Sequence, residues 1–508
     1  MKIFSNEQIR AIEQYTIAHD GVTALDLIGR AAVGIAEEIA KRWEPDTRTV
    51  AFCGWGNNGA DGLDACRLLM QKGFDPEIHL FNIGGQRLSA ECAACRDRLL
   101  EEFPDCRLHE IRQSFEIPDL DRDCLVIDAI FGSGLNRPLP QSLSMLVRAI
   151  NDSGADIVAI DLPSGLQGEW NANTIYSNII HATLTIAIGY PRLAFFIDDN
   201  SELIGSWVTV NIGLNPQAVR ATQYPYYLIT DSNVRRILRQ RRPEYTKADY
   251  GSALICAGSH GMMGAAVLAT RGCLRAGVGK VTCYSPKCGY YVMQTAVPCA
   301  MFLQDPHDAS ISDITLQRDY HAVAIGPGIG TSSVTINALD NFLRVANANG
   351  RPLVLDADAL NCIALRPIML NYVPVMSVIT PHVGEFDRMF GDQPSHEARL
   401  RKAIEVAREH NIVVVLKGRY TAVVRPDGKV HINSSGTPAL ATAGSGDVLT
   451  GIITSFMAQG YTPELAAILG VYIHGAAGIL CEERHGAYGT IASDIADAVG
   501  RAITLLLN

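Results

Sequence analysis

The glycine-rich segment 54–59 is the first part of the sequence whose residues could do chemistry. It reads Gly-Trp-Gly-Asn-Asn-Gly, which matches G-x-G-x-x-G after an apolar run at 49–53 and before a helical pattern at 61–72. Glycines in such a turn let the backbone approach a phosphate at the start of a helix. Asn57, Asn58 and Asp61 add oxygen atoms that suit a hard cation or sugar hydroxyls. The alternative is that these residues serve only a tight turn.

Two aspartates in the same half follow buried strand patterns. Asp128 and Asp161 each end an apolar run, and each is followed within five residues by glycine and serine. The carboxyl ends of parallel strands gather at one edge of a sheet, where ligands bind. We therefore expect both aspartates to face the 57–61 segment across one crevice. Each could instead be a capping aspartate.

A second glycine-rich segment, 444–451, precedes an apolar helix that we expect over 448–457. Its small residues, Gly-Ser-Gly-Asp-Val-Leu-Thr-Gly, would leave amide N–H groups exposed at the helix start, which is an anion-binding arrangement. Asp447 would stand beside the anion and could take a proton from an acceptor hydroxyl. A Walker A motif is absent, because Val278 occupies the lysine position. The alternative is a glycine-rich cap without catalysis.

Further polar segments follow strand patterns upstream and should reach the same sheet edge. They are GPGIG at 326–330, DADALN at 356–361, TPHVGEF at 380–386 and LKGRYT at 416–421. A lone histidine is usually structural, but His382 is a stronger candidate because it lies in a turn beside Pro381 and Glu385. Lys417 would place a cation near this edge.

The elements that position these residues form two series of apolar strands separated by helical patterns. The first series is expected at 49–53, 77–81, 125–128, 157–161, 182–187 and 207–212, and the second at 252–257, 280–284, 322–325, 352–355, 375–379, 412–416, 422–425 and 429–432. Such alternation predicts an α/β protein built from βαβ units around parallel sheets. The N-terminal half should be a Rossmann-like three-layer domain with a mostly parallel sheet. The alternation of predicted strands and helices is interrupted between residues 213 and 230, where we place the domain boundary.

The composition indicates large buried cores. Of 508 residues, 48% are hydrophobic and 19% charged, which excludes a mainly disordered chain. A net charge of −10, with 43 basic against 53 acidic residues, makes a nucleic-acid surface improbable. We expect no membrane-spanning helix and no secretory signal, because no run of 18 apolar residues occurs and the N-terminus is polar. The expected location is the cytoplasm, with reduced thiols.

Three segments of the N-terminal half, taken in order, resemble the NAD(P)H-hydrate epimerases. They are GNNGADG at 56–62, DAIFGSGLNRP at 128–138 and DLPSG at 161–165, and the resemblance covers residues 1–215. One departure is Ala60, where the family more usually has glycine. The resemblance implies that the hydrate is bound by Asn57, Asn58, Gly59, Ala60, Asp61, Gly132, Ser133, Gly134, Leu135, Asn136, Arg137, Pro138 and Asp161. It also implies a potassium ion held by Asn58, Asp128 and Ser164, with Asp161 as the acid–base catalyst at C6 of the hydrate.

The segment GSGD at 444–447 resembles the ribokinase-like superfamily, in which the aspartate is the base of phosphoryl transfer. With the upstream segments in order, residues 228–508 are similar to ADP-dependent NAD(P)H-hydrate dehydratases. This implies a ribokinase-like α/β domain in which Ala265, Gly328, His382 and Asp447 contact the hydrate. ADP would contact Lys417, Gly418, Arg419, Tyr420, Thr421 and Gly446, with Mg²⁺ on its phosphates.

The two resemblances together imply one bifunctional enzyme that repairs hydrated NADH and NADPH (NADHX and NADPHX). The N-terminal domain would interconvert the R and S epimers, and the C-terminal domain would dehydrate the S form with ADP, giving NAD(P)H, AMP and phosphate. We expect a homo-oligomer that uses K⁺ and Mg²⁺. The first alternative is a sugar or vitamin kinase fused to a nucleotide-binding domain. The second is an N-terminal half that only senses nucleotides or binds another protein.

Overall fold

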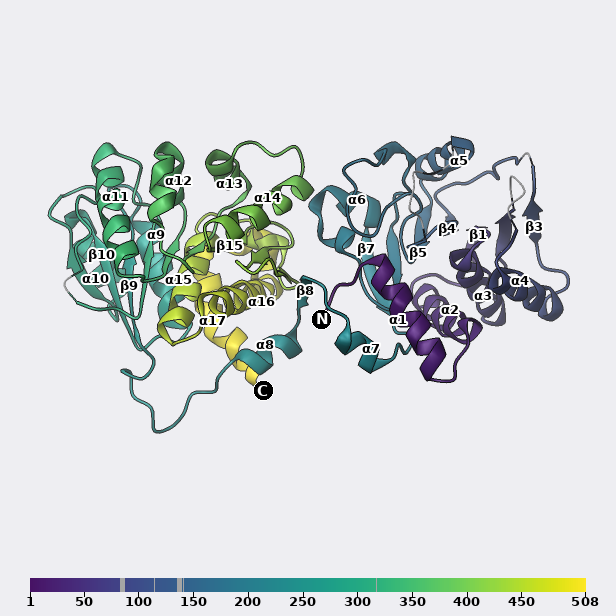
Figure 1. The fold of residues 1–508 in the computed structure, drawn as a ribbon, viewed down its shortest axis with the longest axis horizontal. Coiled ribbons are helices and arrows are strands. Elements are labelled where there is room, and N and C mark those ends of the chain that lie inside the picture. Colours follow the sequence, from purple (N-terminus) through teal and green to yellow (C-terminus); the bar gives the residue numbers. More distant parts are fainter. Residues whose placement is uncertain (83–86, 114, 135–138, 140, 317) are drawn as a thin grey trace. The chain divides into compact units, whose positions relative to one another are not determined.

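The chain folds into two compact units, each of which alternates strands and helices (Figure 1). The computed structural model describes residues 1–82, 87–113, 115–134, 139, 141–316 and 318–508. One unit is Lys2–Tyr224, and the other is Pro225–Asn508 together with Met1. The chain therefore passes from one unit to the other between Tyr224 and Pro225, inside the 213–230 segment.

The first unit is built on a parallel sheet of seven strands in its described residues, in the order β3-β2-β1-β4-β5-β6-β7. The strands are β1 (Arg48–Cys53), β2 (Glu77–Phe81), β3 (Leu108–Ile111), β4 (Cys124–Ala129), β5 (Asp156–Ile160), β6 (Leu184–Ile188) and β7 (Ser206–Val210). Only β3 has no counterpart among the predicted strands. It is a partly exposed edge strand with two polar residues in four, so it lacks the apolar run by which the others are recognised.

Helices cover both faces of this sheet (Figure 1). They are α1 (Asn6–His19), α2 (Ala24–Ala40), α3 (Asn57–Gln71), α4 (Ala90–Glu102), α5 (Gln141–Asp152), α6 (Ser201–Ile204) and α7 (Pro216–Ala221). Successive strand residues point to opposite faces. Ala51 and Ile127 therefore pack beneath α2, α3 and α4, whereas Val50 and Val126 pack against α5.

Helix α3 begins four residues before its predicted start, so the segment 57–61 is the first turn of a helix and not a loop. Its N-cap is Gly56, in an extended conformation. A Cβ on Gly59 would lie 1.8 Å from Gly54 O, so the turn and the helix can pack this closely only without a side chain there. Because Asn and Gly are typical of turns, the sequence does not indicate that the helix begins here.

The second unit contains a ten-stranded sheet in the order β11-β10-β9-β12-β13-β14-β15-β16-β17-β8, counted over its described residues. The strands are β8 (Tyr226–Ile229), β9 (Ser252–Cys256), β10 (Lys280–Ser285), β11 (Met301–Gln304), β12 (Ala322–Ile325), β13 (Leu353–Leu355), β14 (Val378–Ile379), β15 (Val413–Leu416), β16 (Ala422–Val424) and β17 (Val430–Asn433). All neighbouring pairs are parallel except β15–β16 and β16–β17, which are antiparallel.

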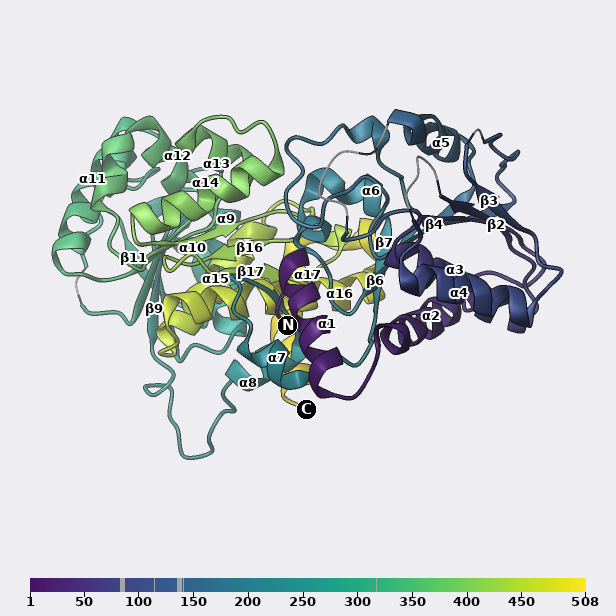
Figure 2. The same ribbon diagram turned by 45° about the vertical axis from the view of Figure 1, so that its right-hand side comes forward.

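Two helical layers enclose this sheet (Figure 2). The helices are α8 (Asp231–Ile237), α9 (Met263–Arg275), α10 (Tyr290–Ala296), α11 (Ser333–Ala348), α12 (Asp358–Leu365), α13 (Val383–Phe390), α14 (His396–Glu409), α15 (Ser445–Ala458), α16 (Pro463–Gly489) and α17 (Ala492–Leu507). Ala253 and Ile255 of β9 share a buried apolar core with α9, α15, α16 and α17. Helices α11–α14 lie on the other side of the sheet (Figure 2).

Strands β8 and β11, at the two edges of this sheet, are missing from the predicted series. β8 lies within residues 213–230, where the predicted series of strands is interrupted, yet it pairs in parallel with β17. Helix α15 begins at Ser445, three residues before its predicted start, and its N-cap is Gly444 at φ +87°, a left-handed conformation that glycine adopts without strain.

Helix α16 meets the length and composition of a membrane-crossing helix, contrary to expectation. However, 72% of its most apolar window is buried inside the protein. It packs against α15 and α17 within the second unit. Burial on this scale is typical of a core helix.

Candidate active sites

The first unit has a cavity of about 590 Å³ at the carboxyl ends of its central strands. In the sheet order, β1 and β4 are neighbours while the chain continues from them to opposite sides, which is a topological switch point where α/β proteins bind ligands. The polar and charged residues lining the cavity are Arg10, Glu13, Gln14, Asn57, Asn58, Asp61, Ser133, Asp161 and Arg192.

Asp161 is the most tightly positioned residue of this cavity. It follows β5 at φ +66°, a left-handed conformation that is uncommon for a residue with a side chain. Its Oδ1 accepts a hydrogen bond from Arg192 Nη2 at 2.8 Å, and its Oδ2 accepts one from the Ser133 backbone N–H at 2.7 Å. Arg192 is only 1% exposed, so this ion pair is buried. The geometry fixes the carboxylate rigidly at the cavity wall.

Gly132 and Asn58 complete the contact between the strand ends. A Cβ on Gly132 would lie 2.8 Å from Asp161 Oδ2, so glycine is required where this loop approaches the carboxylate. In the amide orientation that satisfies both partners, Asn58 donates to Ile160 O and accepts from Gly132 N, each at 3.2 Å. The first turn of α3 is thereby joined to the loops after β4 and β5.

Asp128 lies behind this cavity and does not line it, which corrects the expectation of a single crevice shared with Asp161. Its carboxylate is fully buried and accepts hydrogen bonds from Ser164 N at 2.7 Å and Ser164 Oγ at 2.6 Å. Burial raises the pKa of Asp128 to about 6, although Ser164 opposes this. The side chain belongs to β4, whose buried pattern turns it into the core.

The hydrate-binding positions predicted in this unit divide into three sets. Asn57, Asn58, Asp61, Gly132, Ser133, Gly134 and Asp161 line the cavity. Gly59 and Ala60 are buried in the packing of α3 and are not among the lining residues. Leu135, Asn136, Arg137 and Pro138 lie outside the described residues.

Glu13, Arg10 and Arg192 are lining residues that the sequence analysis missed. Arg10 and Glu13 are on α1, distant in sequence from the glycine-rich segments. The available signal was a charged pair on an otherwise amphipathic helix, which equally fits a solvated face. Arg192 follows β6, and its burial is visible only in three dimensions.

The second unit has a larger cavity, of about 930 Å³, at the carboxyl ends of β13–β15 and the start of α15. It is lined by Asp356, His382, Glu385, the segment 417–421, the segment 433–438, Ser445, Gly446, Asp447 and His474, among others. The size suits a nucleotide-sized ligand. The lining brings together residues from segments far apart in the sequence, from Asp356 to Gly475.

Asp447 is the third residue of α15, beside the N–H groups exposed at the start of that helix. Burial and the charge of Asp356 raise its pKa to about 7, although Lys417 opposes this. A carboxylate with such a pKa can both accept and return a proton near neutral pH. The position is also favourable for an anion, since the helix start carries partial positive charge.

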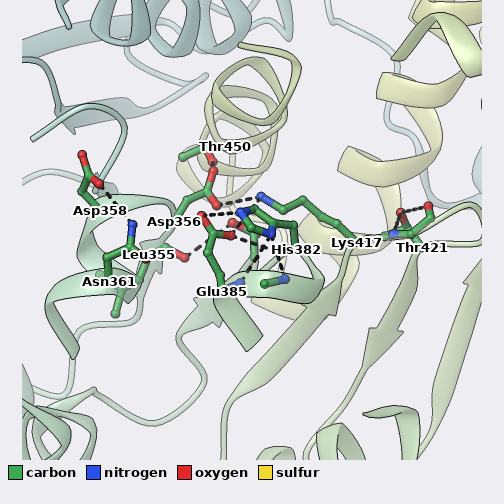
Figure 3. A network of polar contacts seen from close by, with 12 residues as sticks. Leu355, Asp356, Asp358, Asn361, His382, Glu385, Lys417, Thr421 and Thr450 are labelled. Carbon is green, nitrogen blue, oxygen red and sulfur yellow. Dashed lines mark hydrogen bonds and ion pairs between the residues drawn. The ribbon is translucent and has the colours of Figure 1, made fainter. Parts of the chain in front are cut away.

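A buried ionic network joins Asp356, Lys417 and Thr450 at this cavity (Figure 3), and its charges act on Asp447. Asp356 Oδ1 is 3.0 Å from Lys417 Nζ, and Asp356 Oδ2 accepts a hydrogen bond from Thr450 Oγ1 at 2.6 Å. Lys417 Nζ is also 3.7 Å from Glu385 Oε2. Burial alone would lower the pKa of Lys417, but the carboxylates of Asp356 and Glu385 raise it. The ammonium group therefore stays charged at the cavity wall.

His382 forms the N-cap of α13, and this is where its side chain is engaged (Figure 3). Its Nδ1 accepts hydrogen bonds from Gly384 N at 3.0 Å and Glu385 N at 3.3 Å. In the other direction, Glu385 Oε2 accepts a hydrogen bond from His382 N at 2.9 Å. Half of the imidazole remains exposed toward the cavity, so capping and ligand contact are compatible.

Close backbone approach explains one glycine beside this network, Gly326, whereas a Cβ on Gly446 would make only an ordinary contact with Lys417 Nζ at 3.4 Å. Gly326, at φ +136°, lies against Asp356, where a Cβ would meet Asp356 O at 1.8 Å.

The predicted dehydratase positions are placed as follows. His382, Asp447, Gly446 and the segment 417–421 line the large cavity. Ala265 and Gly328 do not; they lie against each other, and a Cβ on Gly328 would be 3.0 Å from Ala265 Cβ.

Ser445 and His474 are lining residues that the sequence analysis missed. His474 Nε2 is 3.0 Å from Ser445 Oγ, and burial lowers the pKa of His474 to about 4, so the imidazole is neutral. His474 is in the apolar helix α16, where a single histidine gives no signal in sequence.

Comparisons with known proteins cover both units. A family model described as "NAD(P)H-hydrate dehydratase" matches residues 253–501, and one described as "YjeF-related protein N-terminus" matches residues 24–194. Among solved structures, an ADP/ATP-dependent NAD(P)H-hydrate dehydratase from Bacillus subtilis is 34% identical, covering 55% of this chain and 98% of its own, with a TM-score of 0.49.

Curated relatives span nearly the whole chain. The bifunctional NAD(P)H-hydrate repair enzyme Nnr of Moorella thermoacetica is 34% identical over 94% of this chain and 92% of its own length. The Escherichia coli enzyme of the same name is 30% identical over 95% of this chain and 90% of its own. The chain belongs to the family of bifunctional NAD(P)H-hydrate repair enzymes.

Proposed function

We propose that the unit Lys2–Tyr224 interconverts the R and S hydrates of NADH and NADPH, and that the unit Pro225–Asn508 dehydrates the S form with ADP. The observation that carries this proposal is the position of Asp447, a carboxylate with a pKa near neutrality beside a helix start and a charged lysine. Family membership supports both activities.

In the dehydratase, Asp447 takes the proton of the C6 hydroxyl of the hydrate. That oxygen attacks the β-phosphorus of ADP, and the bond to the bridging oxygen breaks, releasing AMP. The C6–O bond then breaks, phosphate departs with its electron pair, and the ring nitrogen supplies electrons before a proton is lost to give NAD(P)H. Lys417 and the N–H groups at the start of α15 would stabilise charge on the transferring phosphoryl group.

Mg²⁺ is proposed for the nucleotide phosphates of this cavity. The Bacillus subtilis dehydratase was co-crystallised with ATP and Mg²⁺, which supports a metal–nucleotide complex. Within the described residues no group of three or more His, Cys, Asp or Glu side chains is placed to hold a metal ion. When bound, Mg²⁺ would neutralise phosphate charge, with the acidic residues Asp356 and Asp447 available nearby.

The dehydratase assignment is tested with Asp447→Asn, which keeps the size of the side chain but cannot accept the proton. We expect turnover of the S hydrate to fall by about 10²–10⁴-fold with ADP affinity retained. The matched control is Asp494→Asn, since Asp494 is also the third residue of its helix and lies outside the cavity. Near-normal turnover of Asp447→Asn, or collapse of ADP affinity with it, would rule out a base at this position.

In the epimerase, we propose that Asp161 moves protons at C6 and that a potassium ion is held by Asn58, Asp128 and Ser164. The oxygen atoms of these residues suit a hard cation, and Asp128 is a fully buried carboxylate that accepts hydrogen bonds from residues 130 and 164. A bound cation would offset the burial that raises its pKa. The ion would join the first turn of α3 to the loops after β4 and β5.

Asp128→Asn tests the potassium site because it removes the charge and keeps the shape. We expect epimerisation by the unaltered protein to depend on K⁺ when the salt is varied against a large organic cation. In the variant this dependence should be lost and the hydrate should bind more weakly. An identical K⁺ response of both proteins would reject Asp128 as a ligand.

We further propose that the enzyme works in the cytoplasm as a homo-oligomer. All thirteen cysteines are free, which suits a reducing compartment. Exposed apolar side chains gather on α10 and the edge strand β11, where Tyr290, Tyr291 and Met301 are 41–81% exposed. Light scattering of the purified protein tests self-association, and a monomer at all concentrations would refute it.

A further inference from the structure

Each carboxylate oxygen of Asp161 accepts one hydrogen bond. Oδ1 faces the guanidinium of Arg192 at 2.8 Å, and Oδ2 faces the Ser133 backbone N–H at 2.7 Å. Both partners are donors and each oxygen keeps a further lone pair, so Asp161 is placed to act as a proton acceptor. A site with Asp161 alone therefore contains a proton acceptor and lacks a donor.

Inversion at C6 requires both a proton donor and a proton acceptor. The hydroxyl group must leave from one face of the ring, and water must return on the other face. Departure is much easier as water than as hydroxide, so the leaving oxygen needs a proton donor. The incoming water must give up a proton to an acceptor. Two groups on different sides of the cavity are needed, in opposite states of protonation.

Helix α1 supplies a second carboxyl group. Arg10, Glu13, Gln14 and Ile17 all line the cavity, and their spacing of three, four and seven residues is that of one helical face. The opposite face, with Ile9, Ile12 and Thr16, is buried in the unit. Glu13 thus faces the cavity from α1, whereas Asp161 faces it from the end of β5.

The surroundings of Glu13 favour its protonated form. Burial and the negative charge of Asp161 raise the pKa of Glu13 to about 7, although Arg192 and Arg10 oppose this. Asp61, on α3, is the other carboxyl group that interacts with it. Pairs of carboxyl groups whose environments separate their protonation states are typical of acid–base catalysis.

We infer that Glu13 is the second proton-transfer residue of the epimerase site, acting from α1 together with Asp161 at the end of β5; this rests on the epimerase function proposed above. Glu13 gives its proton to the C6 oxygen as the C6–O bond breaks and water leaves with the bonding electrons. The ring nitrogen shares its lone pair with C6, forming a C=N bond. Water adds to the other face of C6, the electrons return to nitrogen, and Asp161 takes the proton.

In the reverse direction the two carboxyl groups exchange roles. After one inversion Glu13 is ionised and Asp161 protonated, and exchange of protons with solvent restores the starting state. Glu13 is only partly buried, so it can exchange in this way. Asp61 is more deeply buried, and burial and the charge of Asp161 raise its pKa, which favours the protonated form whose O–H can donate a hydrogen bond to the substrate.

The test uses the full chain and the separated R epimer of NADH hydrate without ADP, following appearance of the S epimer. Glu13→Gln mimics the protonated side chain but cannot give up its proton, so we expect epimerisation to slow by at least about 10²-fold. The control is Glu7→Gln, an exposed residue of α1 that does not line the cavity. Dehydration of the S epimer with ADP should be unchanged in both variants.

The pH profile separates a proton donor from a packing residue. In the unaltered protein, kcat/KM for epimerisation should fall above about pH 7 as Glu13 loses its proton, and Glu13→Gln should lack this alkaline limb. Glu13→Asp should be slower but keep the limb. A Glu13→Gln variant with normal rate, or with the limb intact, would overturn the inference. If the unaltered chain converts the S epimer with ADP but never interconverts epimers, the proposed epimerase fails, and the role of Glu13 with it.

Discussion

At the scale of single residues, the dehydratase depends on how Asp447 and Asp356 share one lysine. Asp356 holds Lys417 Nζ at 3.0 Å and so keeps the ammonium group from pairing fully with Asp447. Its negative charge also raises the pKa of Asp447, next after burial itself. A base must be ionised to act, so kcat/KM of the dehydratase should fall as pH drops through about 7.

Replacing Asp356 by Asn should move this acid limb to lower pH, because one neighbouring negative charge is lost and Lys417 becomes free to pair with Asp447. The rate at neutral pH should also fall, since a weaker base accepts the proton less readily. The control variant is Asp392→Asn, because Asp392 is exposed and does not line the cavity. If the acid limb of the kcat/KM profile lies at the same pH in the Asp356→Asn variant, Asp356 only supports the fold.

At the scale of elements, the sequence predicts most strands but not where the helices begin. Apolar runs locate the central strands because these are buried on both faces. The edge strands β3, β8 and β11 escape because they are short, partly polar or next to prolines and tyrosines. Helices α3 and α15 begin at Asn57 and Ser445, earlier than predicted, because their first turns contain glycine, asparagine and serine, residues that are typical of turns.

The same limit applies to the sites. Asp161, His382 and Lys417 follow strand patterns, and Asp447 lies in a glycine-rich segment before a helix, so all four could be selected from sequence. Their partners could not. Glu13, Arg192 and His474 lie on helices or loops far along the chain, and only folding brings them to the cavities.

Close backbone packing at the start of α3 predicts a sharp steric effect. A Cβ on Gly59 would meet Gly54 O at 1.8 Å, so Gly59→Ala must displace either the turn or the helix. Such overpacking costs about 1–3 kcal/mol or more, and we expect a lower unfolding temperature for the first unit and loss of epimerisation. Gly29→Ala, whose Cβ would meet only Asp64 Oδ2 at 4.0 Å, should be tolerated. Calorimetry on both variants checks this, and equal stability would contradict the contact.

At the scale of the whole molecule, each unit has its own sheet and its own apolar core. We therefore expect the fragments 1–224 and 225–508 to fold separately. The cut follows Tyr224, because β8 pairs with β17 and a fragment starting at residue 228 would divide that strand. With ADP, the fragment 225–508 should convert one epimer's share of a mixed hydrate and stop, and adding 1–224 should release the rest. Full conversion by 225–508 alone, with spontaneous epimerisation excluded, would refute the division of labour.

Two activities in one chain make sense chemically, since damage produces both configurations at C6 and a dehydratase for one form would leave the other to accumulate. Family membership sets aside the alternatives of a sugar or vitamin kinase and of a pure nucleotide sensor.

The most direct measurement is to give the full chain a mixture of both NADH hydrate epimers with excess ADP and K⁺, and to follow the absorbance of reduced nicotinamide together with AMP. The account predicts complete recovery of the absorbance, with one AMP and one phosphate formed for each hydrate consumed. In the Asp161→Asn variant, recovery of the absorbance should stop once the S epimer is consumed. In the Asp447→Asn variant, almost no absorbance should be recovered. The account would be contradicted if the unaltered protein recovered the absorbance of only one epimer, or if it recovered the absorbance without forming AMP.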